Sequence, residues 1–405
     1  MSKVTNHLAS RLALALLAGL ATAGFFQGGS GARGPGATVE ASTAAPAITL
    51  RDIEYARAGD KSLKLDLHLP AGDGPFPVIV WIHGGGWTSG DKELSAAGAQ
   101  LRQTARGYAV ASINYRLSHE AKFPAQIEDC KAAVRWLRAN ASEHKLDPDR
   151  IAAWGSSAGG HLAALLGVSA GADGLEGDGG NLEYSSRVLA VVDWFGPVDL
   201  LKMNADSLGF PCNLIDHNSP LSPESLLIGC AIQTCAEKAA RANPITYASA
   251  DDAAFLIMHG TDDCLVGPTQ SQRLQNALRA AGVEASLKFI EGAGHGGSEF
   301  ERAENRNLLD EFLDKHLSSQ AEPVKITAAS VSGKKLFVFG ENFSTGAAVL
   351  LDGRKQKTSN DEQNPTTALT AKKAGKKISR GQTVTLEVRN SDGRLSEPFI
   401  FTRPQ

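Results

Sequence analysis

The sequence lacks an excess of charge of either sign, and this absence removes two classes of partner. Its 405 residues carry a formal net charge of -3, with 41 lysines and arginines against 44 aspartates and glutamates. Binding to nucleic acid or to an anionic membrane surface depends on a dense positive patch. We therefore expect neither a nucleic acid nor a charged membrane surface as a partner.

The sequence also lacks the short motifs that hold common cofactors. It contains no HExxH metalloprotease motif, no cysteine–histidine cluster with zinc spacing, and no GxGxxG directly after a predicted strand. We expect no metal and no organic cofactor, so the chemistry has to come from the side chains of the chain itself.

Near the N-terminus there is no apolar run long enough to read as a membrane span. The run from Leu12 to Ala23 follows Lys3 and Arg11 and ends in the small residues Ala21-Thr22-Ala23. This pattern is typical of a cleaved signal peptide, here residues 1–23, and predicts export to the periplasm or the medium with no stable membrane insertion after cleavage. The alternative is an uncleaved N-terminal anchor. A lipoprotein is not expected, because the first cysteine is Cys130.

Cysteine is scarce, and its distribution matters because an exported chain can form disulfides. Cys130 falls on the apolar face of a predicted helix and is interpreted as a buried thiol. At least one disulfide is predicted among the other four cysteines, and their pairing stays open; the alternative is four free buried thiols. These residues are Cys212, Cys230, Cys235 and Cys264.

The middle of the chain alternates between strand-like and helix-like segments. Residues 24–47, rich in Gly, Ala, Ser and Thr, are interpreted as a flexible linker, and the alternation extends over residues 48–318. Predicted strands are "SLKLDLHLP", "FPVIVWIHGGG", "YAVASINY", "RIAAWG", "VLAVVDWFG", "AAFLIMHG" and "ASLKFIEG"; predicted helices include Leu94–Arg106, "PAQIEDCKAAVRWLRANA", "HLAALLGV", "TQSQRLQNALRAAG" and Asn305–Leu317. This order predicts an α/β fold with a mostly parallel sheet covered on both faces. Proline-rich residues 196–250 interrupt it as an insertion over one end of the sheet.

The last part of the chain, residues 322–405, has a different residue pattern. Short alternating segments are separated by Gly, Asn and Asp turns, and no helical period is evident. This pattern predicts a small all-β sandwich as a second domain.

A candidate nucleophile lies in "RIAAWGSSAGGHLAALLG". Residues Gly155 to Gly159 satisfy G-x-S-x-G with Ser157 at the centre, between a buried strand and a helix. Such a turn forces the serine into strained backbone geometry and exposes its hydroxyl above the sheet. The neighbouring Ser156 lacks this symmetric placement and is interpreted as a turn residue.

Three further elements complete a hydrolytic constellation. "WIHGGGW" follows a buried strand, and its glycines can turn backbone N–H groups toward an oxyanion. Asp262 and Asp263 follow one strand, and His295 follows the next. The order serine, aspartate, histidine is typical of a hydrolase fold. We interpret His83 as a brace of the glycine loop, and His119, His161 and His217 as weaker candidates for the base.

Residues from about 53 to 317 resemble the α/β-hydrolase family, specifically the hormone-sensitive-lipase-like and bacterial feruloyl-esterase-like carboxylesterases. The matching stretches are "HGGGWTSGDK", "NYRLS", "FPAQIEDCKAAVRWLR", "DPDRIAAWGSSAGGHLAAL", "SPESLLIG", "NPITY", "HGTDDCLV" and "GAGHGG". The resemblance implies that Ser157, Asp263 and His295 are catalytic. Asp263 rather than Asp262 is the acid, because the family's acid is the fifth residue of the H-G-x-x-D element. Cys264 departs from the proline that is common in that family after the acid. The resemblance also implies that the oxyanion hole is formed by Gly85, Gly86 and Ala158.

The C-terminal segment resembles an IPT/TIG immunoglobulin-like domain through "LFVFGENFSTGAAVLLDG" and "TVTLEVRNSDGRLSEPFIF". Such domains often act as spacers or attachment modules, so the resemblance implies contact with a surface or polysaccharide rather than chemistry.

These features predict an exported serine carboxylesterase that forms an acyl-enzyme on a small-molecule or polysaccharide-linked ester. A peptidase or amidase on the same fold is one alternative. A non-catalytic carbohydrate- or surface-binding protein is the other. The acyl and alcohol groups of the substrate and the oligomeric state stay open.

Overall fold

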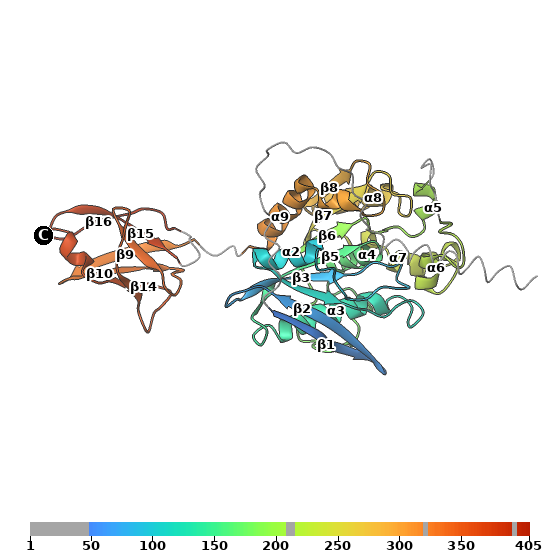
Figure 1. The fold of residues 1–405 in the computed structure, drawn as a ribbon, viewed down its shortest axis with the longest axis horizontal. Helices are drawn as coiled ribbons and strands as arrows, with labels where there is room; N and C mark the ends of the chain where they lie inside the picture. The colour runs from blue at the N-terminus through green and yellow to red at the C-terminus, as the bar shows by residue number, and fades with distance from the viewer. Residues whose placement is uncertain (1–47, 208–214, 319–322, 391–394) are drawn as a thin grey trace, which may run out of the picture. The chain divides into compact units, whose positions relative to one another are not determined.

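The computed structural model describes residues 48–207, 215–318, 323–390 and 395–405. The chain divides into two compact units, Met1–Ser318 and Ser319–Gln405 (Figure 1). The predicted signal peptide and linker, residues 1–47, and Cys212 lie outside the described residues.

The first unit is built on an eight-stranded sheet with the order β1-β2-β4-β3-β5-β6-β7-β8. Its strands are β1 (Ile48–Ala58), β2 (Lys61–Leu69), β3 (Phe76–Ile82), β4 (Ala109–Ile113), β5 (Leu146–Ser156), β6 (Ala190–Trp194), β7 (Ala254–Gly260) and β8 (Ala285–Ile290). β1 and β2 are antiparallel to their neighbours, and β4, β3 and β5 to β8 are parallel to one another. β1 has no counterpart among the predicted strands, because most of its side chains are exposed or half-buried and do not alternate.

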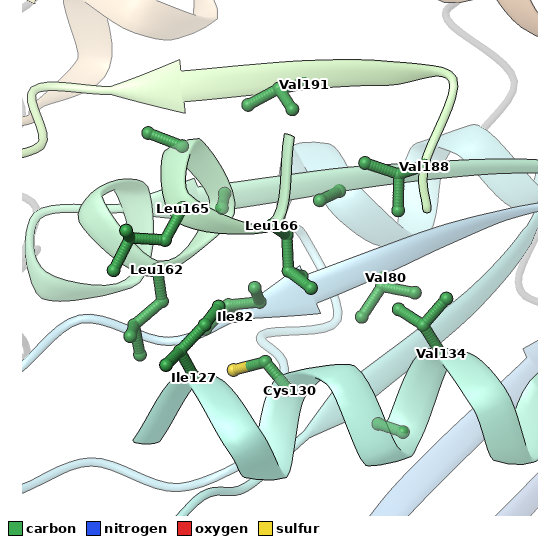
Figure 2. Packing of buried hydrophobic residues seen from close by; sticks show 14 of the residues in the cluster. Val80, Ile82, Ile127, Cys130, Val134, Leu162, Leu165, Leu166, Val188 and Val191 are labelled. Atoms are coloured by element: carbon green, nitrogen blue, oxygen red, sulfur yellow. The ribbon is translucent and has the colours of Figure 1, made fainter. Parts of the chain in front are cut away.

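Helices cover both faces of this sheet. They are α2 (Ala99–Arg102), α3 (Ala125–Ala139), α4 (Ala158–Val168), α8 (Thr269–Ala280) and α9 (Ala303–Leu317). Alternate residues of β3 point to opposite faces, as a strand requires. Val80 and Ile82 share a buried cluster with residues of α3, α4 and α8, and Figure 2 shows them beside α3 and α4. Ile79 belongs to a second buried cluster, with residues of α2 and α9. None of the helices in the described part of the chain is long and apolar enough to cross a membrane.

The helix predicted from Leu94 to Arg106 is wrong in its length. α2 begins only at Ala99 and continues as a 3-10 turn, η1 (Gln103–Arg106). Gly98 has extended backbone geometry (φ -70°, ψ 150°), and its N–H bonds the carbonyl of Ser95 in a turn that precedes the helix. The glycine therefore separates the helix from the residues before it.

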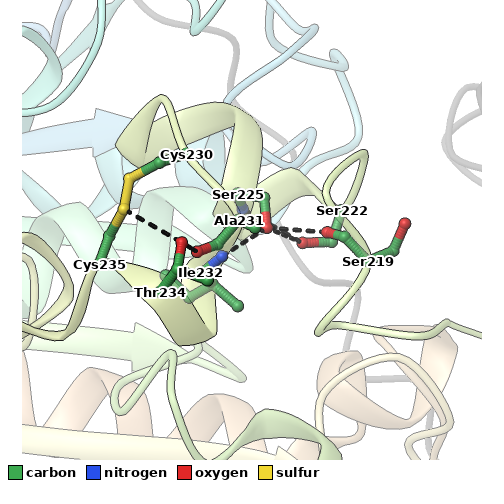
Figure 3. Close-up of a disulfide and its surroundings, with 8 residues drawn as sticks. All are labelled: Ser219, Ser222, Ser225, Cys230, Ala231, Ile232, Thr234 and Cys235. Carbon is green, nitrogen blue, oxygen red and sulfur yellow. Dashed lines mark hydrogen bonds between the residues drawn. A yellow bond between two sulfur atoms is a disulfide. The ribbon is translucent and has the colours of Figure 1, made fainter.

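Within its described residues, the segment predicted as an insertion contains only short helical pieces. They are α5 (Met203–Asp206), α6 (Pro223–Ile228), η2 (Ile232–Thr234), α7 (Ala236–Arg241) and η3 (Pro244–Tyr247). A disulfide joins Cys230 to Cys235 and confirms that at least one bridge forms among the four cysteines (Figure 3). Beside it, the Ser225 hydroxyl accepts a hydrogen bond from the backbone N–H of Ile232, at 3.0 Å. The disulfide and this bond fix the turn between α6 and α7.

The second unit has two four-stranded sheets, ordered β13-β14-β10-β9 and β12-β11-β15-β16. Its elements are β9 (Lys325–Ser332), β10 (Lys335–Glu341), β11 (Ala348–Leu351), β12 (Arg354–Lys355), β13 (Thr358–Asn360), β14 (Ala368–Ala371), β15 (Thr383–Arg389), β16 (Phe399–Thr402) and the turn η5 (Ala374–Lys377). Leu336 and Val338 from one sheet and Val384 and Leu386 from the other share one buried cluster. The two sheets therefore enclose a single apolar core.

Candidate active site

Ser157 lies in the tight turn between the end of β5 and the start of α4. Its φ is 55°, the left-handed region that a residue with a side chain rarely occupies. Two glycines make the turn possible. A Cβ on Gly155 would lie 2.1 Å from the carbonyl oxygen of Gly159, and a Cβ on Gly159 would lie 2.0 Å from that of Ile82. The backbones of the helix, the turn and the sheet therefore pack closely, with no side chain between them at Gly155 and Gly159. This packing restricts the position of the serine.

The loops after β7 and β8 bring Asp263 and His295 to this serine. The Ser157 hydroxyl lies 2.8 Å from Nε2 of His295, and Nδ1 of His295 lies 2.6 Å from Oδ2 of Asp263. With a neutral imidazole, Nδ1–H donates to the carboxylate, and Nε2 accepts from the serine. The Asp262 side chain is exposed and accepts a hydrogen bond from the Thr261 hydroxyl, while Asp263 is buried. The structure therefore separates the two aspartates that are adjacent in the sequence.

The Asp263 carboxylate is held by backbone groups as well as by imidazoles. Its Oδ1 accepts from the backbone N–H groups of Leu265 and Val266, both at 2.9 Å. Burial by itself raises the pKa of Asp263, but the charges and hydrogen bonds of His295 and His259 outweigh it and hold the pKa well below its usual range. The group therefore stays a carboxylate across the pH range in which a histidine titrates.

Sequence reasoning missed the contact between His259 and Asp263. His259 ends β7 in the core, where Nε2 lies 2.8 Å from the carbonyl oxygen of Val266 and 3.2 Å from Oδ2 of Asp263. Its Nδ1 lies 2.6 Å from the Ser271 hydroxyl. The only signal for this contact was the four-residue separation of His259 and Asp263 within "HGTDD". His259 and His295 thus contact the same oxygen of the aspartate, and His259 helps to position it.

The glycine loop after β3 lies next to the serine. Gly85 and Gly86 have φ values of 106° and 59°. The loop is supported by His83, whose Nδ1 lies 2.7 Å from the carbonyl oxygen of Gly84 and whose ring stacks on Tyr115 with centroids 4.3 Å apart. Burial lowers the pKa of His83 to about 4, so it is neutral at pH 7 and suited to a bracing role.

A small pocket opens at the Ser157 hydroxyl. Of the residues predicted for the oxyanion hole, Gly86 and Ala158 line this pocket and Gly85 does not. The other wall residues are Trp87, Pro197, Ile215, His217, Pro223, Glu224, Leu265 and Val266, together with Ser157 and His295. Five of them belong to the insertion, so the insertion shapes the pocket. Glu224 had no sequence signal beyond its place in "SPES", whereas His217 was a weak candidate for the base.

The fold and the order of these residues define a class. A mostly parallel sheet flanked by helices, with serine, aspartate and histidine following β5, β7 and β8 in that order, is the α/β-hydrolase arrangement. A family model described as BD-FAE matches residues 65–278. The chain belongs to the BD-FAE family.

Curated relatives and solved structures agree with this assignment. The chain is 31% identical over 246 residues to "Probable carboxylic ester hydrolase LipM" and 32% identical over 243 residues to "Esterase LipQ", both from Mycobacterium tuberculosis. Each match covers 59% of this chain, and 54% and 55% of the relatives, so the chain spans about half the length of the curated relatives it matches.

Two solved structures match almost over their whole length. "Truncated form of carbohydrate esterase from gut microbiota" matches with a TM-score of 0.61 and 32% identity, over 68% of this chain and 98% of that one. "Thermogutta terrifontis esterase 2 phosphonylated by sarin" matches with a TM-score of 0.54 and 27% identity, over 66% of this chain and 96% of that one.

Proposed function

We propose that this chain is a serine carboxylesterase and that Ser157, His295 and Asp263 are its catalytic triad. The observation that carries the proposal is the continuous hydrogen-bonded path Ser157–His295–Asp263, with distances of 2.8 and 2.6 Å, at the mouth of a pocket. The names of its relatives, which are esterases and carboxylic ester hydrolases, support ester bonds as the target.

The reaction uses each group in a distinct role. The Ser157 oxygen attacks the ester carbonyl while His295 Nε2 takes its proton, and Asp263 holds the imidazole in the required tautomer and stabilises its positive charge. His295 then gives the proton to the leaving alkoxide, which departs as an alcohol and leaves an acyl group on Ser157. Water, deprotonated by His295, releases the acid and restores the serine.

The oxyanion of each tetrahedral intermediate needs backbone donors beside Ser157. We assign these donors to the N–H groups of Gly86 and Ala158, which line the pocket, with Gly85 as the third. Ala158 is the first residue of α4, where backbone N–H groups lack partners within the helix. Preorganised donors of this kind stabilise the transition state more than the ground state.

The substrate class and the setting are further parts of the proposal. Similarity to a structure described as a carbohydrate esterase supports an ester carried on a carbohydrate. The signal-peptide pattern at residues 1–23 supports export, and the two-sheet C-terminal unit is compatible with an immunoglobulin-like IPT/TIG module that attaches the enzyme to a surface or polysaccharide.

Labelling with a fluorophosphonate and turnover of p-nitrophenyl acetate test the proposal together. The wild-type protein should be labelled at Ser157 on peptide mapping, and Ser157→Ala should lose at least about 10⁴-fold in kcat along with the label. Ser156→Ala is the matched control and should keep both. Labelling at Ser156, or no label and no turnover in the wild type, would contradict the proposal.

A further inference from the structure

A buried acid–base pair forms part of the pocket wall. His217 and Glu224 both belong to the insertion, and both are almost fully buried, with 2% and 3% of their surfaces exposed. The His217 Nδ1–H donates to Oε1 of Glu224 at 2.8 Å. Both side chains line the same pocket as Ser157 and His295.

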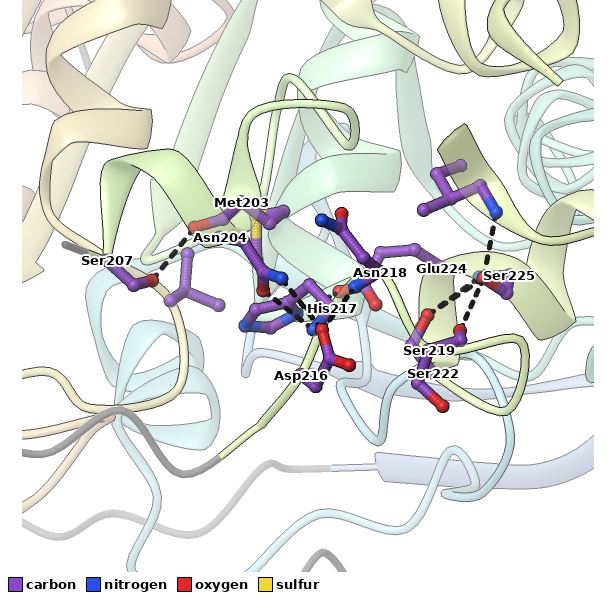
Figure 4. Close-up of polar contacts among 12 residues, drawn as sticks. Met203, Asn204, Ser207, Asp216, His217, Asn218, Ser219, Ser222, Glu224 and Ser225 are labelled. Carbon is purple, nitrogen blue, oxygen red and sulfur yellow. Dashed lines mark hydrogen bonds and ion pairs between the residues drawn. The ribbon is translucent and has the colours of Figure 1, made fainter. Parts of the chain in front are cut away.

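A polar network fixes this pair in place (Figure 4). The backbone N–H of His217 donates to Oδ1 of Asn204 at 2.8 Å, and the Asn204 amide nitrogen donates to Asp216 at 2.7 Å. Glu224 lies in the first turn of α6, which is capped by Ser222 through a hydrogen bond from the backbone N–H of Ser225. The two segments that carry the pair are therefore held independently of the pair itself.

One oxygen of the Glu224 carboxylate lacks a hydrogen-bond donor among the described residues. This oxygen, Oε2, is buried. Burial lowers the pKa of His217, but the hydrogen bond and charge of Glu224 outweigh burial and raise it above its ordinary value. An unpaired oxygen of a buried carboxylate costs free energy unless a ligand supplies a donor.

The pair is not part of the proton path. Within the described residues, no hydrogen bond connects His217 or Glu224 to Ser157, His295 or Asp263. A carboxylate that faces the pocket and has a free lone pair can accept a hydrogen bond, and the commonest donor on an uncharged ester is a hydroxyl group.

We propose that Glu224, held by His217, is the specificity-determining residue of the pocket and accepts a hydrogen bond from a hydroxyl group of the ester substrate. The preferred substrates are then hydroxylated esters, with the hydroxyl on either the alcohol or the acyl portion. This inference rests on the proposed esterase function and extends it to the choice of substrate.

Two isosteric pairs of esters test the proposal and distinguish the two portions. 2-Hydroxyethyl acetate against propyl acetate changes CH₃ to OH in the alcohol, and ethyl glycolate against ethyl propionate does so in the acyl group. The wild type should prefer the hydroxylated ester in one pair. Glu224→Gln keeps the shape and can still accept from His217, but it places an NH₂ donor where Oε2 was. The preference ratio of kcat/KM values should then fall by about tenfold to a hundredfold.

Glu237→Gln is the matched control, because Glu237 is exposed on α7 of the same insertion. It should keep the wild-type ratio for both pairs. Glu224→Asp, which keeps the charge at shorter reach, should retain more of the ratio than Glu224→Gln does.

The outcomes separate this inference from the proposed function. If Glu224 only supports the fold, Glu224→Gln will slow both members of each pair equally and leave the ratio unchanged, and this result overturns the inference. A wild type that hydrolyses p-nitrophenyl acetate but treats both pairs alike also overturns it while the esterase stands. A wild type inactive on every ester overturns the proposed function and this inference with it.

Discussion

The two units of this chain bury different kinds of residue. The interior of the first unit contains ionisable side chains on several elements, among them Asp193, His217, Glu224, His259 and Asp263. In the second unit, the buried polar residues within the described ranges are Gln356, Asn390 and Ser396, and none of them is ionisable. Burying a charge is costly unless it is paired, so a core that contains many such groups is organised for chemistry as well as for stability.

The two units also differ in their content of tryptophan and tyrosine. All five tryptophans and all five tyrosines precede residue 248, so they lie in the first unit and none lies after residue 318. Tryptophan fluorescence therefore follows the unfolding of the first unit alone. The unfolding of the first unit can therefore be measured in the intact chain.

The largest expected effect is at the carboxylate that contacts His295. Asp263→Asn preserves the shape but favours the wrong imidazole tautomer, so turnover should fall by about 10³- to 10⁴-fold. Asp262→Asn should cost less than about tenfold, because this side chain is exposed and is hydrogen-bonded to Thr261. Steady-state kinetics on one aryl ester, with circular dichroism to confirm folding, is the measurement. A reversed order of the two variants would contradict the assignment of the acid.

The next effect concerns a buried carboxyl below the serine turn. Asp193 Oδ1 accepts from the backbone N–H of Gly196 at 2.9 Å, its Oδ2 has no partner among the described residues, and burial raises its pKa to about 6. The folded protein therefore binds a proton that the unfolded chain releases near pH 4, and stability falls as the pH rises through about 6. Asp193→Asn removes this dependence.

The free energy of unfolding of the wild type, relative to Asp193→Asn, should decrease by about 2 kcal/mol between pH 4 and pH 7. Denaturant titrations followed by tryptophan fluorescence at the two pH values give this difference. A constant difference between the two proteins would show that Asp193 is ionised in the folded state at both pH values.

A smaller effect is expected from the disulfide between Cys230 and Cys235. The bridge closes a short loop, with a sequence separation of 5, so its removal should cost about 1 to 2 kcal/mol, at the lower end for disulfides. Replacing both cysteines by serine and measuring unfolding by tryptophan fluorescence tests this. Cys130→Ser is a useful contrast, because that thiol is free and fully buried in the core beside α4.

The smallest effect on turnover should come from removing the second unit. No residue of the proposed triad or oxyanion hole lies beyond His295. A chain that ends at Ser318 should therefore keep its kcat/KM on p-nitrophenyl acetate to within a few-fold. A loss beyond about tenfold, or about 1.4 kcal/mol, with an unchanged fluorescence transition would show that the second unit shapes the site.

The sequence was most informative where backbone geometry is restrictive. The glycines around Ser157 and the buried strands before Gly84 and Asp262 could be recognised, because small residues and continuous apolar runs have few structural uses. The order of strands and helices followed from the same signals. β1 was missed, since an exposed edge strand carries no such pattern.

The residues of the pocket wall could not be predicted from such patterns. His217 and Glu224 meet through the folding of short helical pieces of the insertion. His217 is held there by a hydrogen bond to Asn204, 13 residues earlier in the chain. Glu224 follows His217 by seven positions along the chain, in a stretch without regular period. Likewise, only the folded chain shows that His259 contacts Asp263.

The close packing at Gly155 and Gly159 leaves no space for a Cβ atom, and this has a consequence for engineering the protein. Any side chain there would collide with the backbone of Gly159 or Ile82, so these positions tolerate no diversity in a mutant library. The wall residues Ile215 and Leu265 reach the pocket from loops outside the turn. A library that randomises these two positions would alter the accepted substrates while the serine keeps its position above the sheet.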